Sequence, residues 1–248
     1  MNEAVPQIVD AEAARDFMQE TLERITPSEL EAIAGELEEK SDSFNGLLSP
    51  TRLPSLSEED LRKTMRSIFV TRRRIDTILG TVSVDGLRQH LQHLLYGDAP
   101  IAERFQSFSD ALAPLDESFR FDLASEYLHF TLPDRYWLWT RWMWDPNSET
   151  GSLPLVTLQE FDLHAPSLGE MYEKVGMAVA FVDRTREAID GYRQIGHGVF
   201  GTDVYLACVY SIYVYTVLKM RMTKEFTKVI PELAGLTRRL LGVQQKEV

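Results

Sequence analysis

Apolar side chains recur every three or four residues along most of the chain, and this spacing predicts amphipathic helices. A first helix is predicted from the apolar positions Ala13, Phe17, Leu22 and Ile25. The clearest later stretches are residues 27–40, 57–79, 83–96, 101–112, 168–192 and, after Pro231, the end of 226–241. We therefore expect an all-α protein, one multi-helix globular domain of about eight or nine helices.

Polar residues at the start of several stretches have the pattern of helix caps. Thr26 precedes Pro27 and stands three residues before Glu29, so we expect Thr26 to cap a helix that begins at Pro27. Ser57 and Ser167 open two more helices in the same way, Ser167 with Glu170 as its reciprocal partner. The Ser, Pro and Gly content of residues 41–55 predicts a loop between the second helix and the long third one.

The charge distribution suggests a division of the chain. Residues 1–40 are strongly acidic and are followed by the predicted loop. We expect residues 1–55 to form an acidic helical arm and loop, and residues 56–248 to form the main helical domain. The centre of that domain is predicted to be the Trp-rich segment, residues 133–154.

All four tryptophans of the protein lie in this Trp-rich segment. On a helix, Trp137 and Trp144 would lie on one side and Trp139 and Trp142 nearly opposite, so the segment must be covered on most sides. It is therefore either buried core or a surface that a partner covers, because Trp, Tyr and Arg are enriched at binding hot spots. The partner-binding candidates are Arg135, Trp137, Trp139, Arg141, Trp142, Trp144, Tyr210 and Tyr213.

The last two candidates belong to an apolar stretch at residues 204–218, which also contains Tyr205 and Tyr215. The stretch is shorter than the roughly 20 residues that a membrane-spanning helix needs. Its tyrosine hydroxyls require partners when buried. We expect a helix at a core boundary or a subunit contact, and no membrane span.

The formal net charge is −12. An acidic surface repels phosphate, so nucleic-acid binding would need a local basic patch. One basic cluster occurs in the long third helix and is formed by Arg62, Lys63, Arg66, Arg72, Arg73 and Arg74. Such a charge run is typical of a solvated helix face that offsets the acidic arm. The alternative is a phosphate-binding surface on Arg62, Arg66, Arg72, Arg73 and Arg74.

Residues with metal or catalytic chemistry are few. The single cysteine, Cys208, excludes an intramolecular disulfide and a Cys-based zinc site within this chain. His90 and His93 have helical spacing, but no third ligand accompanies them, so we expect no metal. The glycine run around His197 lacks the Walker A and dinucleotide-binding patterns, and we expect no cofactor.

Two sequences, 94–105 and 123–139, resemble a helical module found beside bacterial restriction and mobile-element proteins. That module is itself similar to the helix-hairpin-helix fold of DNA glycosylases. The second sequence ends in Pro133-Asp134-Arg135-Tyr136-Trp137, like the turn that closes a helix of the module. The resemblance covers residues 94–139 and implies a shared scaffold in a bacterial protein. Residues 115–122 depart from it, since they hold no glycine and three acids where the hairpin would contact phosphate.

Three functions are consistent with these patterns. The first is a non-catalytic accessory or assembly protein of a cytoplasmic complex, which binds another copy or another protein chain. The second is a nucleic-acid-binding module of a restriction or defence-type system that uses the Arg62–Arg74 cluster. The third is a small-molecule binder or enzyme with a pocket lined by Trp137, Trp139, Trp142, His129 and Asp145.

Overall fold

A computed structural model describes residues 8–185, 198, 200–221 and 232–243, with side chains to residue 217 in the third range. Within these ranges the chain is all-α and contains no strand. Two isolated antiparallel bridges, Val9 to Thr157 and Asp145 to Thr150, are the only β pairings there. The predicted fold class is confirmed, and the predicted helix 226–241 is described only from residue 232.

The described residues form eleven α-helices and one short 3-10 helix. They are α1 (Ala11–Arg24), α2 (Pro27–Leu48), η1 (Leu53–Ser55), α3 (Glu58–Arg66), α4 (Ile75–Thr81), α5 (Val84–Tyr96), α6 (Ile101–Ala111), α7 (Glu117–Thr131), α8 (Leu153–Val156), α9 (Leu168–Thr185), α10 (Phe200–Arg221) and α11 (Leu233–Leu241). The predicted count was low because one expected helix is split in two, because α7 shows no amphipathic period and because α8 is only four residues long.

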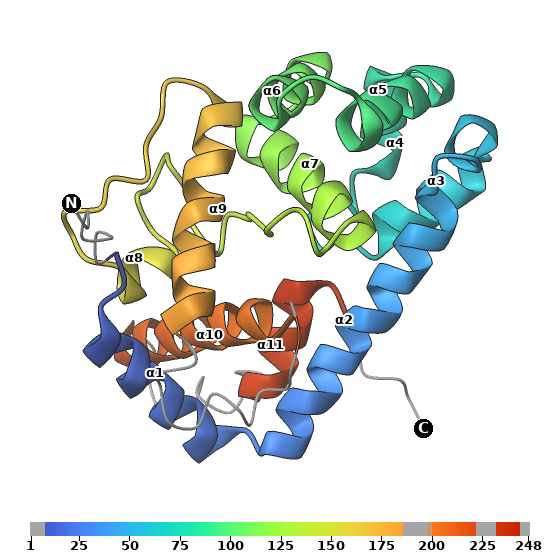
Figure 1. Ribbon diagram of the computed structural model, residues 1–248. Coiled ribbons are helices and arrows are strands. Elements are labelled where there is room, and N and C mark those ends of the chain that lie inside the picture. The colour runs from blue at the N-terminus through green and yellow to red at the C-terminus, as the bar shows by residue number, and fades with distance from the viewer. Residues whose placement is uncertain (1–7, 186–197, 199, 222–231, 244–248) are drawn as a thin grey trace.

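Helix α7 is the centre of the fold. Every residue from Phe121 to Thr131 is buried, so this part of the helix has no solvent face and no amphipathic pattern. It packs against α2, α5 and α6, while α6 packs on α9 and α10 packs on α1, α2 and α11. Figure 1 shows the long α2 along one side, α5 and α6 at one end, and α1, α10 and α11 at the other.

The expected acidic arm, residues 1–55, contains α1 and α2. Met18 of α1 and Leu37 of α2 belong to the same hydrophobic cluster as Leu128 of α7 and Val209 of α10. Arg238 of α11 binds two α2 carboxylates at 3.1 Å and 3.0 Å, those of Glu29 and Glu36. These contacts join both ends of the described chain to α2.

Helix α2 is longer than the prediction, which ended it at residue 40. The extra turns pack Phe44 and Leu48 into the core. The Ser41 hydroxyl donates to the Phe130 carbonyl at 3.0 Å, and the Asn45 amide donates to the Thr131 carbonyl at 3.1 Å. Residues that favour loops locally therefore lie in a helix here, because α7 satisfies their polar groups and tertiary packing overrides propensity.

The predicted long helix 57–79 was wrong at its middle. Helix α3 ends at Arg66, and turns occupy residues 67–74 before α4 begins. The Ser67 hydroxyl donates to the Thr64 carbonyl at 2.7 Å, and the buried Thr71 hydroxyl donates to the Met65 and Ile68 carbonyls. Side-chain hydroxyls thus compete for carbonyls that would continue the helix. The break places Arg72, Arg73 and Arg74 on an irregular segment.

The predicted helix starts are confirmed. Thr26 accepts the Glu29 amide at 3.3 Å, and Ser57 and Asp60 form a complete capping box. The Ser167 hydroxyl accepts the Glu170 amide at 3.2 Å and donates to the Glu170 carboxylate at 3.0 Å, in place of the expected bond from the Ser167 backbone N–H to that carboxylate. The Glu29 carboxylate binds Arg238 instead of returning to the Thr26 backbone.

Candidate functional site: an arginine-lined pocket

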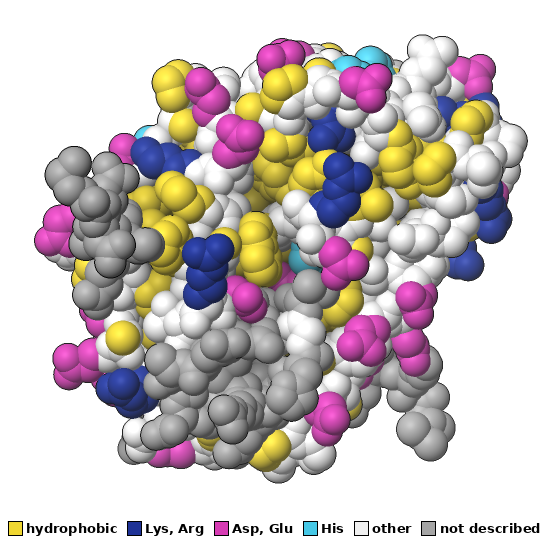
Figure 2. Space-filling view, in the orientation of Figure 1, with side chains coloured by type: hydrophobic (Ala, Val, Ile, Leu, Met, Phe, Trp, Pro, Cys, Tyr) yellow, Lys and Arg dark blue, Asp and Glu magenta, His cyan; other side chains and the backbone are white. Residues whose placement is uncertain are grey.

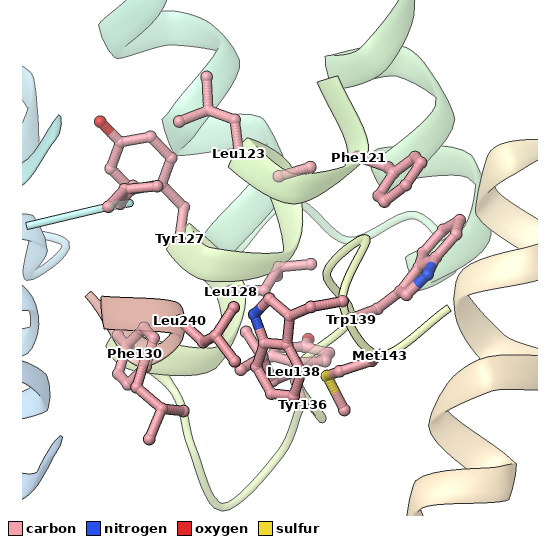
Figure 3. Close-up of a cluster of buried hydrophobic side chains, with 14 of the residues drawn as sticks. Phe121, Leu123, Tyr127, Leu128, Phe130, Tyr136, Leu138, Trp139, Met143 and Leu240 are labelled. Atoms are coloured by element: carbon pink, nitrogen blue, oxygen red, sulfur yellow. The ribbon is translucent and has the colours of Figure 1, made fainter. Parts of the chain in front are cut away.

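The Trp-rich segment is part of the core. Trp139, Trp142 and Trp144 are buried, and Trp137 is half-buried. The Trp139 ring lies parallel to Phe121 of α7 with centroids 4.2 Å apart, and its Nε1 donates to the Trp144 carbonyl at 2.9 Å. Figure 3 shows Phe121 and Trp139 on one side of α7, with Tyr127 and Phe130 on the other. Three of the four indoles are therefore inside the described structure.

The remaining partner-binding candidates lie in different surroundings. Arg135 is exposed, with its guanidinium 5.5 Å from the Tyr136 ring centroid. Tyr210 and Tyr213 are half-buried on α10, their ring centroids 6.1 Å apart. Arg141 is the one that joins a larger group of cations, because its guanidinium reaches from the Trp-rich segment towards the N-terminal end of α7.

A pocket of about 610 Å³ collects five arginines from three parts of the chain. Arg72, Arg73 and Arg74 come from the turns after α3, Arg141 comes from the Trp-rich segment, and Arg239 comes from α11. We call this group the arginine pocket. Its other lining residues are apolar apart from one acid, and they are Phe69, Val70, Asp116, Phe119, Leu236 and Leu240.

The charges of the arginine pocket are only partly compensated. Arg74 binds the exposed Asp116 carboxylate at 2.9 Å, and Arg141 binds the buried Asp122 carboxylate at 2.8 Å. Arg72 donates to two carbonyls, those of Arg66 at 3.0 Å and Gly242 at 3.2 Å, which leave its positive charge in place. Arg73 and Arg239 are exposed and have no side-chain hydrogen bond or ion pair with the described residues. Two carboxylates thus face five guanidiniums.

One wall of the pocket presents an apolar ring to solvent. Phe69 is 45% exposed, and Met177 is the only other large hydrophobic side chain exposed to this degree among the residues described. Phe119 is buried in the pocket wall and lies 5.6 Å from the Arg74 guanidinium. The site therefore offers positive charge beside an uncovered apolar surface, a combination typical of recognition sites.

The predicted Arg62–Arg74 phosphate-binding surface is divided by this geometry. Arg62 binds Glu58 at 2.8 Å and Asp76 at 2.7 Å. Arg66 binds Glu59 at 2.7 Å. Only the last three arginines of the set line the pocket. On the face shown in Figure 2, Lys and Arg also lie singly or in small groups, with Asp and Glu spread among them.

A second set of charges is buried in the centre of the molecule. Asp122, Glu126 and His129 lie one turn apart along α7, and each has a partner from another part of the fold. Glu126 accepts from Lys40 of α2 at 2.8 Å, and the Lys40 ammonium also lies 3.7 Å from the Phe130 ring centroid. Burial raises the pKa of Glu126 and lowers that of Lys40, against the attraction between them.

His129, the acid–base candidate of the predicted Trp-lined pocket, is fully buried. Its Nε2 lies 2.8 Å from Asp203 of α10 and its Nδ1 lies 2.8 Å from the Tyr136 carbonyl. Burial favours the neutral ring, but attraction to Asp203 and these hydrogen bonds together raise the His129 pKa. Trp139 fills the space between aromatic rings of the core, and Asp145 lies in a tight turn where it accepts the Asn147 amide. His129 and Trp139 have no exposed surface, whereas Asp145 is half-buried in its turn.

Asp122 links the buried charges to the arginine pocket. Its side chain is 1% exposed, and it accepts both the backbone N–H and the Nε–H of Arg141 at 2.8 Å. Burial raises the Asp122 pKa to about 7, although Arg141 opposes the shift. Asp122 is thus a buried carboxyl that titrates near neutral pH beside a pocket arginine.

The other sequence predictions concern metal and membrane. No group of three or more His, Cys, Asp and Glu side chains in the described ranges is placed to hold a metal ion. No helix among the described residues is long and apolar enough to span a bilayer. His197 lies outside the described residues.

No protein-family model, curated protein or solved structure matches the chain. The described residues form an all-α fold with an arginine-lined pocket at its surface. Arg239, Asp122 and Phe69 were missed by the sequence analysis. Arg239 carried a signal, since it stands on the polar side of the predicted 226–241 helix, but nothing in the sequence places it beside Arg73.

Proposed function

We propose that this protein is a non-catalytic accessory protein that binds another protein chain through the arginine pocket. The segment of the partner that enters the pocket carries acidic side chains next to a large apolar side chain. The observation that carries the proposal is the group of five arginines facing two carboxylates in a protein of net charge −12. Arginine clusters are a recurrent means of recognising acidic motifs.

The exposed Phe69 ring is the reason for the apolar side chain in the proposed partner segment. A large exposed ring at the edge of a charged pocket loses its contact with water when an apolar side chain covers it. Phe119, Leu236 and Leu240 extend this apolar surface into the pocket. An acidic segment without an apolar side chain would leave Phe69 exposed and would bind less tightly.

The non-catalytic part of the proposal is supported by the state of the candidate acid–base residue. His129 is fully buried and both its ring nitrogens have partners. A general acid or base needs hydrogen-bond access to a substrate. Lys40 and Glu126, which are also ionisable and buried, are bound to each other.

Nucleic acid is the less favoured ligand. A strand presents a row of phosphates, and proteins that follow it use an extended basic stripe. Here Arg62 and Arg66 are paired with carboxylates and Arg74 is paired with Asp116, so of the five predicted phosphate-contact arginines only Arg72 and Arg73 have no ion pair with the described residues. A short acidic segment fits this distribution better than a polynucleotide.

A peptide-display selection tests the proposal. Random peptides would be selected on the wild-type protein and counted again on two double variants, R73S/R239S in the pocket and R62S/R66S outside it. Both variants remove two arginines, so they match in net charge. We expect acidic peptides with an aromatic or large aliphatic residue to be enriched, to be lost on R73S/R239S and to be retained on R62S/R66S.

Two outcomes would overturn the proposal. Selected peptides without excess acidic residues, or peptides that bind R73S/R239S as well as wild type, would remove the pocket as the recognition site. Salt-sensitive binding of single- or double-stranded DNA at low ionic strength that R73S/R239S abolishes, in the absence of peptide binding, would assign the pocket to nucleic acid.

A further inference from the structure

The contact between Asp122 and Arg141 connects the arginine pocket to a buried carboxyl group. Arg141 is the one pocket arginine held by a buried carboxylate. Its backbone N–H and its Nε–H both donate to Asp122, and its Nη1 lies 3.4 Å from the Ser118 hydroxyl. Its side chain is nevertheless 39% exposed and lines the pocket, so the same guanidinium faces the buried acid and the incoming ligand.

We infer that Asp122 is a positioning residue of the arginine pocket, and that an anion entering the pocket competes with Asp122 for Arg141 and drives a proton onto the Asp122 carboxyl. This inference rests on the proposed function. In the free protein, the Asp122 carboxylate orients Arg141 and partly neutralises it. When an acidic ligand arrives, Arg141 turns its charge to the ligand, and Asp122 is left as a buried anion without its partner.

A buried anion that loses its counter-charge takes up a proton, because low-polarity surroundings penalise the charged form. The other groups around Asp122 favour the same outcome. Glu126, one turn further along α7, repels the ionised Asp122 and is itself paired with Lys40 of α2. From α10, Tyr210 lies near enough to interact with Arg141 and with Asp145. Arg141 is thus the one cation among the groups acting most strongly on Asp122.

The Asp122 pKa of about 7 sets the range in which the coupling is visible. Ligand binding raises this pKa, so the protonated carboxyl favours the bound state. By linkage, the affinity for an anion must increase as the pH falls through this range. A rise of about one pKa unit on binding corresponds to about fivefold tighter binding at pH 6 than at pH 8.

The test uses a peptide of glutamates around a central phenylalanine, labelled with tetramethylrhodamine, and inorganic sulfate as its competitor. Neither the carboxylates, the dye nor sulfate titrates between about pH 6 and pH 8, so a change in affinity there belongs to the protein. Fluorescence anisotropy would give the dissociation constant across this range. We expect about fivefold tighter binding at pH 6 in wild type and a flat profile in Asp122→Asn.

The matched control is Asp116→Asn, which removes the other carboxylate bound to a pocket arginine. Asp116 is exposed, and its contact with Arg74 is separate from the buried contact between Asp122 and Arg141. We therefore expect Asp116→Asn to bind the peptide more tightly than wild type and to keep the wild-type slope. A merely structural role for Asp122 would change affinity at every pH alike and would leave the slope in place.

A measurement on the unmodified protein covers the case in which Asp122→Asn does not fold. Calorimetric titration of wild type at about pH 7.5, in buffers of different ionisation enthalpy, gives the number of protons taken up on binding. Uptake of a fraction of one proton supports the inference. Binding without proton uptake overturns the inference and leaves the proposed function intact, whereas no binding of peptide or sulfate at any pH overturns the proposed function.

Discussion

The two groups of charges in this molecule are built on opposite principles. Along α7, the side chains of Asp122, Glu126 and His129 are buried, and each is paired with a group from another part of the fold, as Glu126 is with Lys40 and His129 with Asp203. In the arginine pocket, charges of one sign are gathered at the surface, and Arg73 and Arg239 have no partner among the described residues. The difference is that the interior charges are paired within the fold, whereas part of the pocket charge stays exposed; we propose that the exposed charge binds a ligand.

The largest expected effect concerns the buried charges of α7 and comes from removing one member of the buried Lys40–Glu126 pair. Lys40→Met leaves the Glu126 carboxylate buried without a counter-charge, and we expect the free energy of unfolding to fall by about 3–5 kcal/mol. Chemical denaturation measures this directly. The double variant Lys40→Met/Glu126→Leu replaces the pair by apolar groups and should recover most of the loss. Equal losses in both variants would mean that packing, and not charge pairing, explains the effect.

The second effect concerns Asp122, which stands between the two groups. Its folded-state pKa of about 7 lies above the usual value of 3.8, so the protonated form favours folding. Its stabilising contribution is complete below about pH 4 and is lost as the pH rises through 7. Asp122→Asn has no such loss, so relative to wild type it should gain about 2–3 kcal/mol in unfolding free energy between about pH 5 and pH 8.

Urea denaturation of both proteins at the two pH values gives this gain as a difference of differences. The comparison cancels the other titrating groups that the two proteins share. A constant offset between wild type and Asp122→Asn at both pH values would contradict a neutral-range pKa for Asp122.

For the arginine pocket we expect the opposite pattern: substitution of its exposed arginines should weaken ligand binding without lowering the stability of the fold. In R73S/R239S we expect affinity for a selected acidic peptide to fall by about tenfold to a hundredfold, the range for losing charge-assisted hydrogen bonds. The unfolding free energy should stay within about 0.5 kcal/mol of wild type, because both side chains are exposed. R62S/R66S should keep its peptide affinity. A clear loss of stability in R73S/R239S would show that these arginines belong to the fold.

The smallest predicted effect isolates the apolar part of the site. Phe69→Ser should weaken peptide binding by about threefold to tenfold, since only part of one ring is covered on binding. Met177→Ser provides the control, because Met177 is 44% exposed and lies outside the pocket. Equal effects of the two substitutions on affinity would remove Phe69 from the recognition surface.

Helix starts could be predicted from the sequence, whereas two helix ends could not. Each helix start depends on a side-chain oxygen that accepts the amide three residues later, as in Thr26, Ser57 and Ser167. Such a contact is local, so the sequence predicts it. The end of α2 depends on α7. The Ser41 and Asn45 side chains donate hydrogen bonds to the α7 carbonyls of Phe130 and Thr131, which lie 86 or more residues away in the sequence. The break after α3 depends on the hydrogen bonds that the Ser67 and Thr71 hydroxyls donate to nearby backbone carbonyls.

The site was predictable in its parts and not in its assembly. Arg72–Arg74 and Arg141 were singled out as members of two separate hypotheses, one for nucleic acid and one for a protein partner. The fold brings them together with Arg239 in one pocket. Arg62 and Arg66 lie outside this pocket and form ion pairs with carboxylates. The aromatic content of the Trp-rich segment is equally consistent with a binding hot spot and with a buried core. The packing of Trp139 against Phe121 shows that this part of the segment belongs to the core, and the sequence alone does not predict that packing.

Photo-crosslinking from position 69 tests the central claim most directly. Phe69 would be replaced by benzoylphenylalanine in cells of the source organism, with the same replacement at Met177 as the control. We expect position 69 to yield a defined adduct whose crosslinked peptide carries acidic residues beside an apolar one, and we expect R73S/R239S to abolish it. An adduct that persists in R73S/R239S, or that forms equally from position 177, would contradict the arginine pocket as the partner-binding site.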